Sequence, residues 1–576
     1  MFKLIRFLKP FKKECIVGPL FKLFEAILEL ILPTIMALVI NNGVLTGDKS
    51  YIIKMGIIMI IMTILGFSSS LVCQRYAAYA SQGVGTNLRN ALFEKISSFS
   101  YIELDKFGTP SLVNRITNDV NQLQLAVAML IRLVVRAPFI FIGAIIMAMI
   151  LDLKLSLVLI GTTPIFGLIL YFFISKTAPL YKKYQKKLDS LALKLRETLG
   201  GVRVIRAFTS SKYEEVSFNE YNDDLTNSGI GIVRISSLLN PITSLVMNFT
   251  ILILLWMGAI HINMGSMSSG TIIAFINYVT QILYAMTVVS NLIVLFTKAE
   301  ASALRINEVL ETEPSIVEKE NPIYKDNIES DVIVEFKNVY FSYNNTGDSA
   351  LSDINIKVNK GETIGIIGGT GSGKTTFINL IGRFYDVTSG EVLVKGVNVK
   401  DYPIKRLREI IGIVPQKLEL FTGTIKENLA FGNKDASLDE IIEASKIAQA
   451  YEFISNLEEK FDTKVTRGGT NFSGGQKQRL AITRALVKKP EILILDDSSS
   501  ALDFATDKEL RKAIRENSKD TTVFIVSQRA NSLMECDKIM VFDDGIVEAI
   551  GTHKELINNS KVYKEICLSQ VSKEEV

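Results

Sequence analysis

Long runs of hydrophobic residues fill the first half of the chain and are almost absent from the second half. A helix needs about 20 predominantly apolar residues to cross a bilayer. Six runs reach this length, at 16–40, 52–80, 125–151, 155–175, 236–262 and 271–296. The pattern therefore predicts an α-helical transmembrane domain of six long helices over residues 1–310.

The links between these runs alternate in length. Those at 81–124 and 176–235 are long, contain few Gly or Pro, and hold most of the Lys and Arg found between the runs. We expect them to be helices that project from the membrane on the cytosolic side, because cytoplasmic loops are rich in Lys and Arg. This orientation predicts a multi-pass protein of the cytoplasmic membrane with both termini cytosolic. The basic start, MFKLIRFLKPFKKE, is expected to form an interfacial elbow helix.

Charged residues interrupt two of the predicted spans. Glu25 and Glu29 share one face of the first helix, and Arg132 and Arg136 share a face of the third. Ionisable residues inside a membrane usually face a cavity or a partner of opposite charge. Glu25 and Glu29 are therefore candidates to line a substrate cavity, where they would favour cationic amphiphiles. The alternative is that they form salt bridges inside the helix bundle.

The second half has the composition of a soluble domain. A polar segment predicts a linker over 311–330, and residues 331–576 then alternate strand-like and helix-like segments. The net charge of +4 comes from the hydrophobic half, which argues against a surface that binds nucleic acid. The four Cys lie far apart in the sequence, which argues against a disulfide framework or a zinc site.

A glycine-rich loop follows the strand-like segment TIGIIG and precedes a helix-like one. Its sequence, Gly368-x4-Gly373-Lys374-Thr375, matches the Walker A pattern. In that pattern backbone N–H groups surround the phosphates of ATP, the lysine reaches the β- and γ-phosphates, and the hydroxyl binds Mg²⁺. The predicted ATP contacts from this loop are Gly368, Gly369, Thr370, Gly371, Ser372, Gly373, Lys374, Thr375 and Thr376.

A Walker B strand follows at EILILDD. Four apolar residues place Asp496 at the carboxyl end of this strand, where its carboxylate can hold Mg²⁺ through water. The two Walker motifs together predict an α/β P-loop domain with ATP and Mg²⁺ as its cofactors.

The segment NFSGGQKQR, at 471–479, stands between the two Walker motifs. Its FSGGQ resembles the signature of ATP-binding cassette proteins. Tyr343, Gln416 within IVPQ, and the D-loop SALD that ends at Asp503 match other positions of that family in order. Six spans followed by one cassette resemble a type I ABC exporter half-transporter of the multidrug and lipid-exporting group. ITNDV and ETLGGVRVIRAF in the two long links also fit this resemblance.

This resemblance implies roles for single residues. Tyr343 would stack on adenine, and Gln416 would lie beside Mg²⁺ together with Thr375 and Asp496. Half-transporters of this group form dimers whose cassettes meet head to tail. Each ATP is then enclosed by the Walker motifs of one chain and the signature of the other. In this chain the signature residues are Ser473, Gly474, Gly475 and Gln476.

Two positions depart from the family pattern. Asp497 stands where the family has a catalytic Glu, and Gln528 stands where it has a switch His. The shorter Asp leaves its carboxylate about 1.5 Å further from the attacking water, and errors of about 1 Å can cost roughly a hundredfold in rate. Gln lacks the proton and positive charge that His can carry. Arg467, just before the signature, also replaces a usual Glu.

Both key departures fall in the half-site formed by the Walker motifs, whereas the signature is intact. This asymmetry resembles heterodimeric bacterial exporters that pair one degenerate site with one hydrolysing site. The sequence therefore predicts an ATP-driven efflux subunit for amphipathic compounds, whose partner is a second half-transporter with the Walker B Glu and the switch His. The alternatives are a homodimer that tolerates Asp497 and Gln528, a lipid flippase on the same scaffold, and an ATP-gated regulatory or sensory membrane protein.

Overall fold

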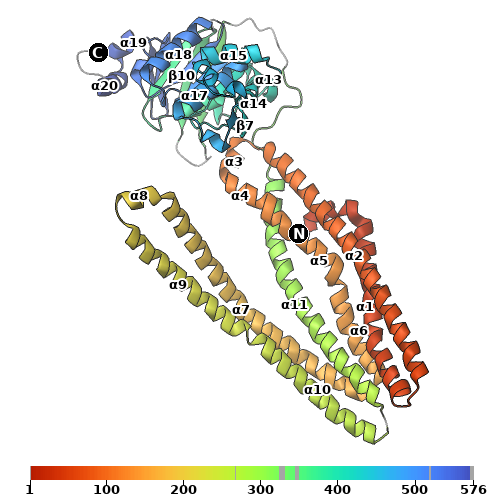
Figure 1. The fold of residues 1–576 in the computed structure, drawn as a ribbon. Coiled ribbons are helices and arrows are strands. Elements are labelled where there is room, and N and C mark those ends of the chain that lie inside the picture. Colours follow the sequence, from red (N-terminus) through yellow and green to blue (C-terminus); the bar gives the residue numbers. More distant parts are fainter. Residues whose placement is uncertain (1, 266, 324–330, 344–348, 518–519, 571–576) are drawn as a thin grey trace. The chain divides into compact units, whose positions relative to one another are not determined.

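The computed structural model describes residues 2–265, 267–323, 331–343, 349–517 and 520–570. The chain divides into two compact units (Figure 1). The helical unit comprises Met1–Ser97 and Thr109–Thr312, and the α/β unit comprises Ser98–Gly108 and Glu313–Val576. A short segment of the first half therefore belongs to the second unit.

The helical unit contains six helical segments that are long and apolar enough to cross a membrane, as the hydrophobic runs predict. The longest single helix has 49 residues and so measures about 74 Å, whereas the hydrocarbon core is about 30 Å thick. The helices of this unit therefore extend well beyond a bilayer. Their bounds are η1 (Phe2–Phe11), α1 (Lys12–Val39), η2 (Ile40–Val44), α2 (Lys49–Ser97), α4 (Thr109–Asn114), η3 (Arg115–Asp119), α5 (Val120–Met129), η4 (Leu130–Val134), α6 (Arg136–Leu151), α7 (Leu153–Gly200), α8 (Val202–Ala207), α9 (Ser211–Ser236), α10 (Leu239–Asn263) and α11 (Ser269–Glu311).

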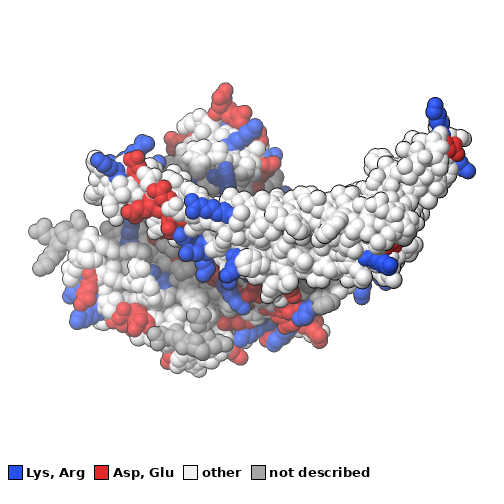
Figure 2. Space-filling model, turned by 90° about the horizontal axis from the view of Figure 1, so that it is seen from below, with Lys and Arg blue, Asp and Glu red and all other residues white. Residues whose placement is uncertain are grey.

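Part of the outer surface of the helical unit is a long apolar stretch. On α2, Ile53, Ile57, Ile60 and Ile64 follow one helical face, and each side chain is more than half exposed. Figure 2 shows a long stretch of surface that is almost free of Lys, Arg, Asp and Glu. Water would not tolerate an apolar surface of this extent, so the surrounding medium of these helices is lipid.

Helices α7 and α9 lie side by side and diverge from the bundle of α1, α2, α5, α6 and α11 (Figure 1). The turn between them leaves large apolar side chains open to solvent, among them Val204, Phe208 and Tyr213. These side chains lie at the end of the α7–α9 pair that α8 connects. The parts of α7 and α9 next to this connection are rich in polar residues.

The charged residues of the first span are engaged in ion pairs within the helical unit. The ammonium of Lys22 lies 2.6 Å from the carboxylate of Glu25, and both side chains are largely buried. The guanidinium of Arg136 on α6 lies 2.6 Å from the carboxylate of Glu29. These contacts correspond to the salt-bridge alternative. A cavity-lining role for Glu25 and Glu29 stays a prediction.

The α/β unit is built on a six-stranded sheet with the order β12-β11-β3-β10-β9-β6, in which all neighbours but β12 pair in parallel. An antiparallel sheet of order β2-β1-β4-β5 and a two-stranded ribbon accompany it. The strands are β1 (Val332–Phe341), β2 (Leu351–Asn359), β3 (Thr363–Gly368), β4 (Ser389–Val394), β5 (Val397–Asn398), β6 (Ile411–Val414), β7 (Gly423–Thr424), β8 (Lys464–Val465), β9 (Ile492–Asp496), β10 (Thr522–Val526), β11 (Lys538–Asp543) and β12 (Ile546–Gly551).

Helices cover the sheet and bury its apolar strands. The strand β9, sequence ILILD, is buried at every position, as expected for a central parallel strand. The helices are α3 (Tyr101–Phe107), α12 (Lys374–Ile381), α13 (Ile404–Glu409), α14 (Ile425–Ala430), α15 (Leu438–Ile447), α16 (Tyr451–Ser455), α17 (Gly474–Val487), α18 (Phe504–Asn517), α19 (His553–Asn559) and α20 (Lys561–Gln570), with the 3-10 turns η5 (Lys460–Asp462), η6 (Arg467–Gly469) and η7 (Ala530–Ser532).

Helix α3 comes from the first long link and packs within the α/β unit. The ring of Tyr101 stacks on Phe384 with 4.9 Å between centroids, and the hydroxyl of Tyr385 donates to the carboxylate of Asp105 at 3.4 Å. Of the predicted linker, Glu311 still belongs to α11, whereas residues 313–323 belong to the α/β unit, where the N–H of Ile323 donates to the carbonyl of Asp401 at 2.8 Å. Residues 324–330 of that linker lie outside the described residues.

We expect Glu29→Gln to lower the apparent melting temperature of the detergent-purified protein, because it removes the anion that neutralises the guanidinium of Arg136. A charge-assisted hydrogen bond of this kind contributes about 1.5–3 kcal/mol. Adding Arg136→Gln to Glu29→Gln should recover part of the loss, since it removes the unpaired cation. Replacement of the exposed Glu94 by Gln serves as the control. The pairing would be contradicted if the melting temperature of the double variant fell by as much as the sum of the decreases in the two single variants.

Candidate nucleotide-binding site

The Walker A loop connects the carboxyl end of β3 to the start of α12. Gly368 and Gly373 adopt φ values of 155° and 99°, which favour glycine. A Cβ atom at Gly373 would also lie 2.7 Å from the side chain of Leu351 and 2.9 Å from the carbonyl of Ala350. The loop thus needs glycine to reach the N-terminus of α12, where free N–H groups attract anions.

Lys374 is the cation of this loop. Its ammonium donates to the carbonyls of Gly368 at 3.0 Å and Gly369 at 2.5 Å, and to the hydroxyl of Ser372 at 3.3 Å. Burial lowers the pKa of Lys374, and the nearby carboxylates of Asp496 and Asp497 oppose this shift. The loop therefore fixes a buried positive charge beside its own N–H groups, an arrangement suited to phosphate oxygens.

Thr375 and Asp496 meet at the adjacent strand end. The hydroxyl of Thr375 lies 3.1 Å from one carboxylate oxygen of Asp496. Burial raises the pKa of Asp496, and the hydrogen bond from Thr375 offsets part of this rise. Hydroxyl and carboxylate oxygens are ligands that Mg²⁺ prefers, and phosphate and water oxygens complete its coordination shell. These two side chains fit Mg²⁺, and the side chain of Gln416 lines the same cavity.

Most of the residues predicted for the Walker half-site line one cavity of about 110 Å³. It lies where the parallel strands β3, β9, β10 and β6 end, the edge at which ligands bind in such sheets. Its lining residues are Thr370, Gly371, Lys374, Thr375, Gln416, Asp496, Asp497, Val526, Ser527 and Gln528.

Asp497 and Gln528 both line this cavity although they lie 31 positions apart in the sequence. Asp497 has a left-handed φ of 48°, and its N–H donates to the carbonyl of Val526 at 3.0 Å. Burial raises the pKa of its carboxyl, and a hydrogen bond from Gln416 opposes that shift. The two departures from the family pattern therefore lie beside the phosphate loop. Their effects on catalysis stay predictions.

Tyr343 lies near the start of α12. Its hydroxyl is 2.8 Å from the hydroxyl of Thr376, and its ring meets the rings of Phe341 and Tyr385 edge to face at 4.8 Å and 5.2 Å. The side chain is 46% exposed. A held but partly open aromatic ring is suited to stacking on a base.

The signature residues begin helix α17. Ser473 caps this helix, and its backbone N–H donates in return to the side chain of Gln476 at 2.9 Å. A Cβ atom at Gly474 would lie 3.3 Å from the side chain of Ala501, and one at Gly475 would lie 3.0 Å from its carbonyl. The four signature residues, as described, are not among those that line the cavity.

Gln478 joins the signature helix to the D-loop, a role that sequence reasoning missed. Its side-chain amide donates to the hydroxyl of Ser500 at 3.1 Å and accepts from the N–H of Ala501 at 3.0 Å. Gln478 is almost fully buried, and a polar residue on the buried face of a helix is the signal that indicates such a contact. Asp503 accepts from the N–H and hydroxyl of Thr506, which lowers its pKa and caps α18.

Comparisons with known proteins agree with this geometry. The family model of the ABC transporter transmembrane region matches residues 15–286, and the ABC transporter model matches residues 351–500. The ABC transporter ATP-binding protein YfiB of Bacillus subtilis is 38% identical over 574 residues, which cover 100% of this chain and 99% of the relative. The chain belongs to the ABC transporter family.

Other relatives place this ABC transporter among exporters. YgaD of B. subtilis, whose name refers to multidrug export, is 32% identical over 98% of both chains. An ATP-dependent lipid A-core flippase of Haemophilus influenzae is 30% identical over 98% of this chain and 96% of the relative. A bacterial Atm1-family ABC exporter with ATP bound has the same fold, with a TM-score of 0.81, 22% identity and coverage of 97% and 99%. The chain is an exporter half-transporter, a multi-pass membrane protein with an ATPase domain that drives transport.

We expect Tyr343→Ala to weaken the binding of ATP by about 1–3 kcal/mol, the range found when an aromatic partner of a stacked base is removed. Tyr343→Phe is the matched control, because it keeps the ring and loses the contact with Thr376. Binding of a fluorescent ATP analogue to the purified transporter measures both variants. Unchanged affinity in Tyr343→Ala would remove Tyr343 from the site.

Proposed function

We propose that this chain exports amphipathic or hydrophobic compounds across the cytoplasmic membrane as one half of a heterodimeric ABC exporter. It supplies a degenerate ATP site and an intact signature for the hydrolysing site of its partner. The observation that carries this proposal is the cavity in which Asp497 and Gln528 accompany Lys374 and Thr375 of the phosphate loop, together with Asp496 and Gln416.

The binding elements of the Walker half-site support tight nucleotide binding. Lys374 exchanges its bonds to Gly368 and Gly369 for bonds to the β- and γ-phosphates of ATP. Thr375 and Asp496, with Gln416 beside them, hold Mg²⁺, which supplies positive charge to the phosphates when it is bound. Tyr343 stacks on adenine. None of these contacts is made by Asp497 or Gln528 themselves, although Asp497 accepts a hydrogen bond from Gln416 and its charge acts on Lys374.

The catalytic elements of the same half-site support slow hydrolysis. The carboxylate of Asp497 is one methylene shorter than that of Glu, so it stands further from a water that attacks the γ-phosphate. Gln528 donates a hydrogen bond to the γ-phosphate but stays neutral during the reaction. The transition state therefore receives less stabilisation than in a site with Glu and His.

The signature supports a role in the ATP site of a second chain. Ser473, Gly474 and Gly475 present a hydroxyl and backbone N–H groups at the N-terminus of the 14-residue helix α17. They lie outside the cavity formed by this chain's own Walker motifs. The partner half-transporter, with a Walker B Glu and a switch His, places its γ-phosphate against them. The exposed Phe208 and Tyr213 at the far end of α7 and α9 support contact with that partner.

An apolar cavity in the helical unit supports the class of substrate. It has a volume of about 840 Å³, within the range of small-molecule sites. Side chains from η1, α2, α5, η4, α6 and α11 line it, among them Leu4, Leu88, Leu123 and Leu292, with Glu300 as the charged residue among the described lining residues. Hydrophobic compounds with one cationic group fit this lining. A lipid flippase is the second candidate, favoured by the H. influenzae relative. An ATP-gated sensor is not favoured, because two of the relatives are named for multidrug export and for lipid flipping.

The asymmetric assignment predicts opposite effects of two substitutions in the purified heterodimer. Asp497→Asn should leave substantial ATPase activity, because the other site performs the turnover. Ser473→Ala should lose most of the activity, because the hydroxyl at the partner's γ-phosphate is removed.

Ser437→Ala is the matched control for this pair, since Ser437 caps α15 with the same reciprocal bonds to Glu440 but lies outside the signature. It should keep full activity. If Asp497→Asn alone stops turnover while Ser473→Ala is silent, this chain hosts the working site and the assignment is wrong.

A further inference from the structure

The last described residue of the chain contacts the segment that carries Gln528. The side-chain amide of Gln570, at the end of α20, donates to the carbonyl of Gln528 at 2.6 Å. Its oxygen accepts from the N–H of Ala530 at 2.8 Å. Both polar atoms of one amide therefore bind the backbone on either side of Arg529.

Helix α20 is fixed firmly enough to act as a support. Tyr563 and Cys567, four positions apart on one face, are fully buried against Ala530, Leu533 and their neighbours. The hydroxyl of Tyr563 also lies 2.8 Å from a ring nitrogen of His553. Gln570 follows three positions after Cys567, so it continues the same face of the helix toward the loop.

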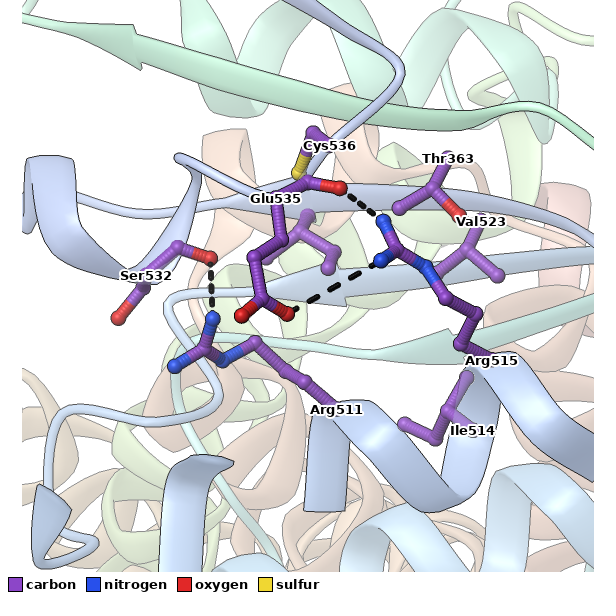
Figure 3. A pocket seen from close by; sticks show the side chains of 9 residues that line it. Thr363, Arg511, Ile514, Arg515, Val523, Ser532, Glu535 and Cys536 are labelled. Atoms are coloured by element: carbon purple, nitrogen blue, oxygen red, sulfur yellow. Dashed lines mark hydrogen bonds and ion pairs between the residues drawn. The ribbon is translucent and has the colours of Figure 1, made fainter. Parts of the chain in front are cut away.

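The segment that carries Gln528 runs from the end of β10 to the start of β11, and its part nearer to β11 is held by other contacts. Arg511 of α18 donates to the carbonyl of Ser532 at 3.1 Å, and the hydroxyl of Ser532 donates to Asp507 at 3.1 Å. Figure 3 shows Arg515 of α18 facing the backbone carbonyl and the carboxylate of Glu535. These contacts hold Ser532 and Glu535. Gln570 instead holds the backbone of Gln528 and Ala530, at the end of the segment that reaches the nucleotide cavity.

A contact on the D-loop side completes the support of the loop. The guanidinium of Arg529 donates to the carbonyl of Ser500 at 3.2 Å. Gln528 thus projects into the cavity from a backbone held between the D-loop and α20. A change in the amide of Gln570 acts directly on the peptide group that orients Gln528.

We propose that Gln570 is a positioning residue for the contact between Gln528 and the γ-phosphate, so that the C-terminal helix sets how strongly this site prefers ATP over ADP. The proposal rests on the γ-phosphate role of Gln528 given above. ADP lacks the γ-phosphate, so its binding is independent of this contact.

Gln570→Glu tests the proposal with an almost isosteric change. The carboxylate still accepts from Ala530, but it places an oxygen against the carbonyl of Gln528 in place of a donor. The affinity for a non-hydrolysable ATP analogue should fall about three- to tenfold, the value of one or two hydrogen bonds, while the affinity for ADP stays unchanged. Competition against azido-ATP labelling of this chain, in the full-length transporter, measures both affinities even when a partner chain is present.

Ser569→Ala is the control, because the hydroxyl of this adjacent residue donates to the carbonyl of Ile566 within α20 and, among the described residues, makes no hydrogen bond with the Gln528 segment. Its affinities should equal those of the parent. The decisive variant combines Gln570→Glu with Gln528→Ala, in which Gln570→Glu should have no further effect on the ATP analogue.

Several results would overturn the proposal: an equal loss for ADP, a full effect of Gln570→Glu in the Gln528→Ala background, or an unchanged ATP preference in Gln570→Glu or in Gln528→Ala. The measurement involves neither transport nor turnover. A wrong assignment of the export function or of the slow site would therefore leave its result unaffected.

Discussion

The nucleotide site depends on a buried charge balance at the carboxyl ends of parallel strands. The ammonium of Lys374 is taken out of water by its own loop, which lowers its pKa, and the carboxylates of Asp496 and Asp497 counter that cost. Burial in turn raises the pKa of both carboxyls. The proposed ligand, Mg-ATP, would satisfy both sides at once, because its phosphates would meet the cation and its Mg²⁺ would meet the carboxylate oxygens.

Hydrogen bonds and a ring contact connect several elements of the α/β unit near this site. Gln478 ties the signature helix to the D-loop, Arg529 ties the Gln528 loop to the same D-loop, and Gln570 ties that loop to α20. The ring of Tyr343 meets Tyr385, whose hydroxyl bonds to Asp105 on α3. Residues that would touch the γ-phosphate and a partner's ATP are thus linked through the D-loop, whereas the ring that would touch adenine is linked to α3. A change at Gln478 or Arg529 has a short physical route to the D-loop.

Local patterns in the sequence predict much of this architecture. The six spans follow from run length alone, and the phosphate loop follows from glycine spacing between a strand and a helix, since both are properties of neighbouring residues. Other contacts join positions far apart in the chain. They are the ion pair of Glu29 with Arg136, the hydrogen bonds of Gln478 to the D-loop, and the packing of α3 in the α/β unit. No periodicity encodes such contacts, because they depend on how elements pack after they form. The same limit applies to Gln570, which resembles any polar residue at the end of a terminal helix.

The central claim is that the ATP bound to the Walker motifs of this chain stays intact while the ATP bound to the Walker motifs of the partner is hydrolysed. The direct measurement is the chemical state of the nucleotide on each chain during steady-state turnover, obtained by photolabelling with an azido-ATP that carries its radiolabel on the α-phosphate and separating the two chains. The account predicts mainly triphosphate on this chain and mainly diphosphate on the partner. Diphosphate on this chain in equal or greater proportion would contradict it.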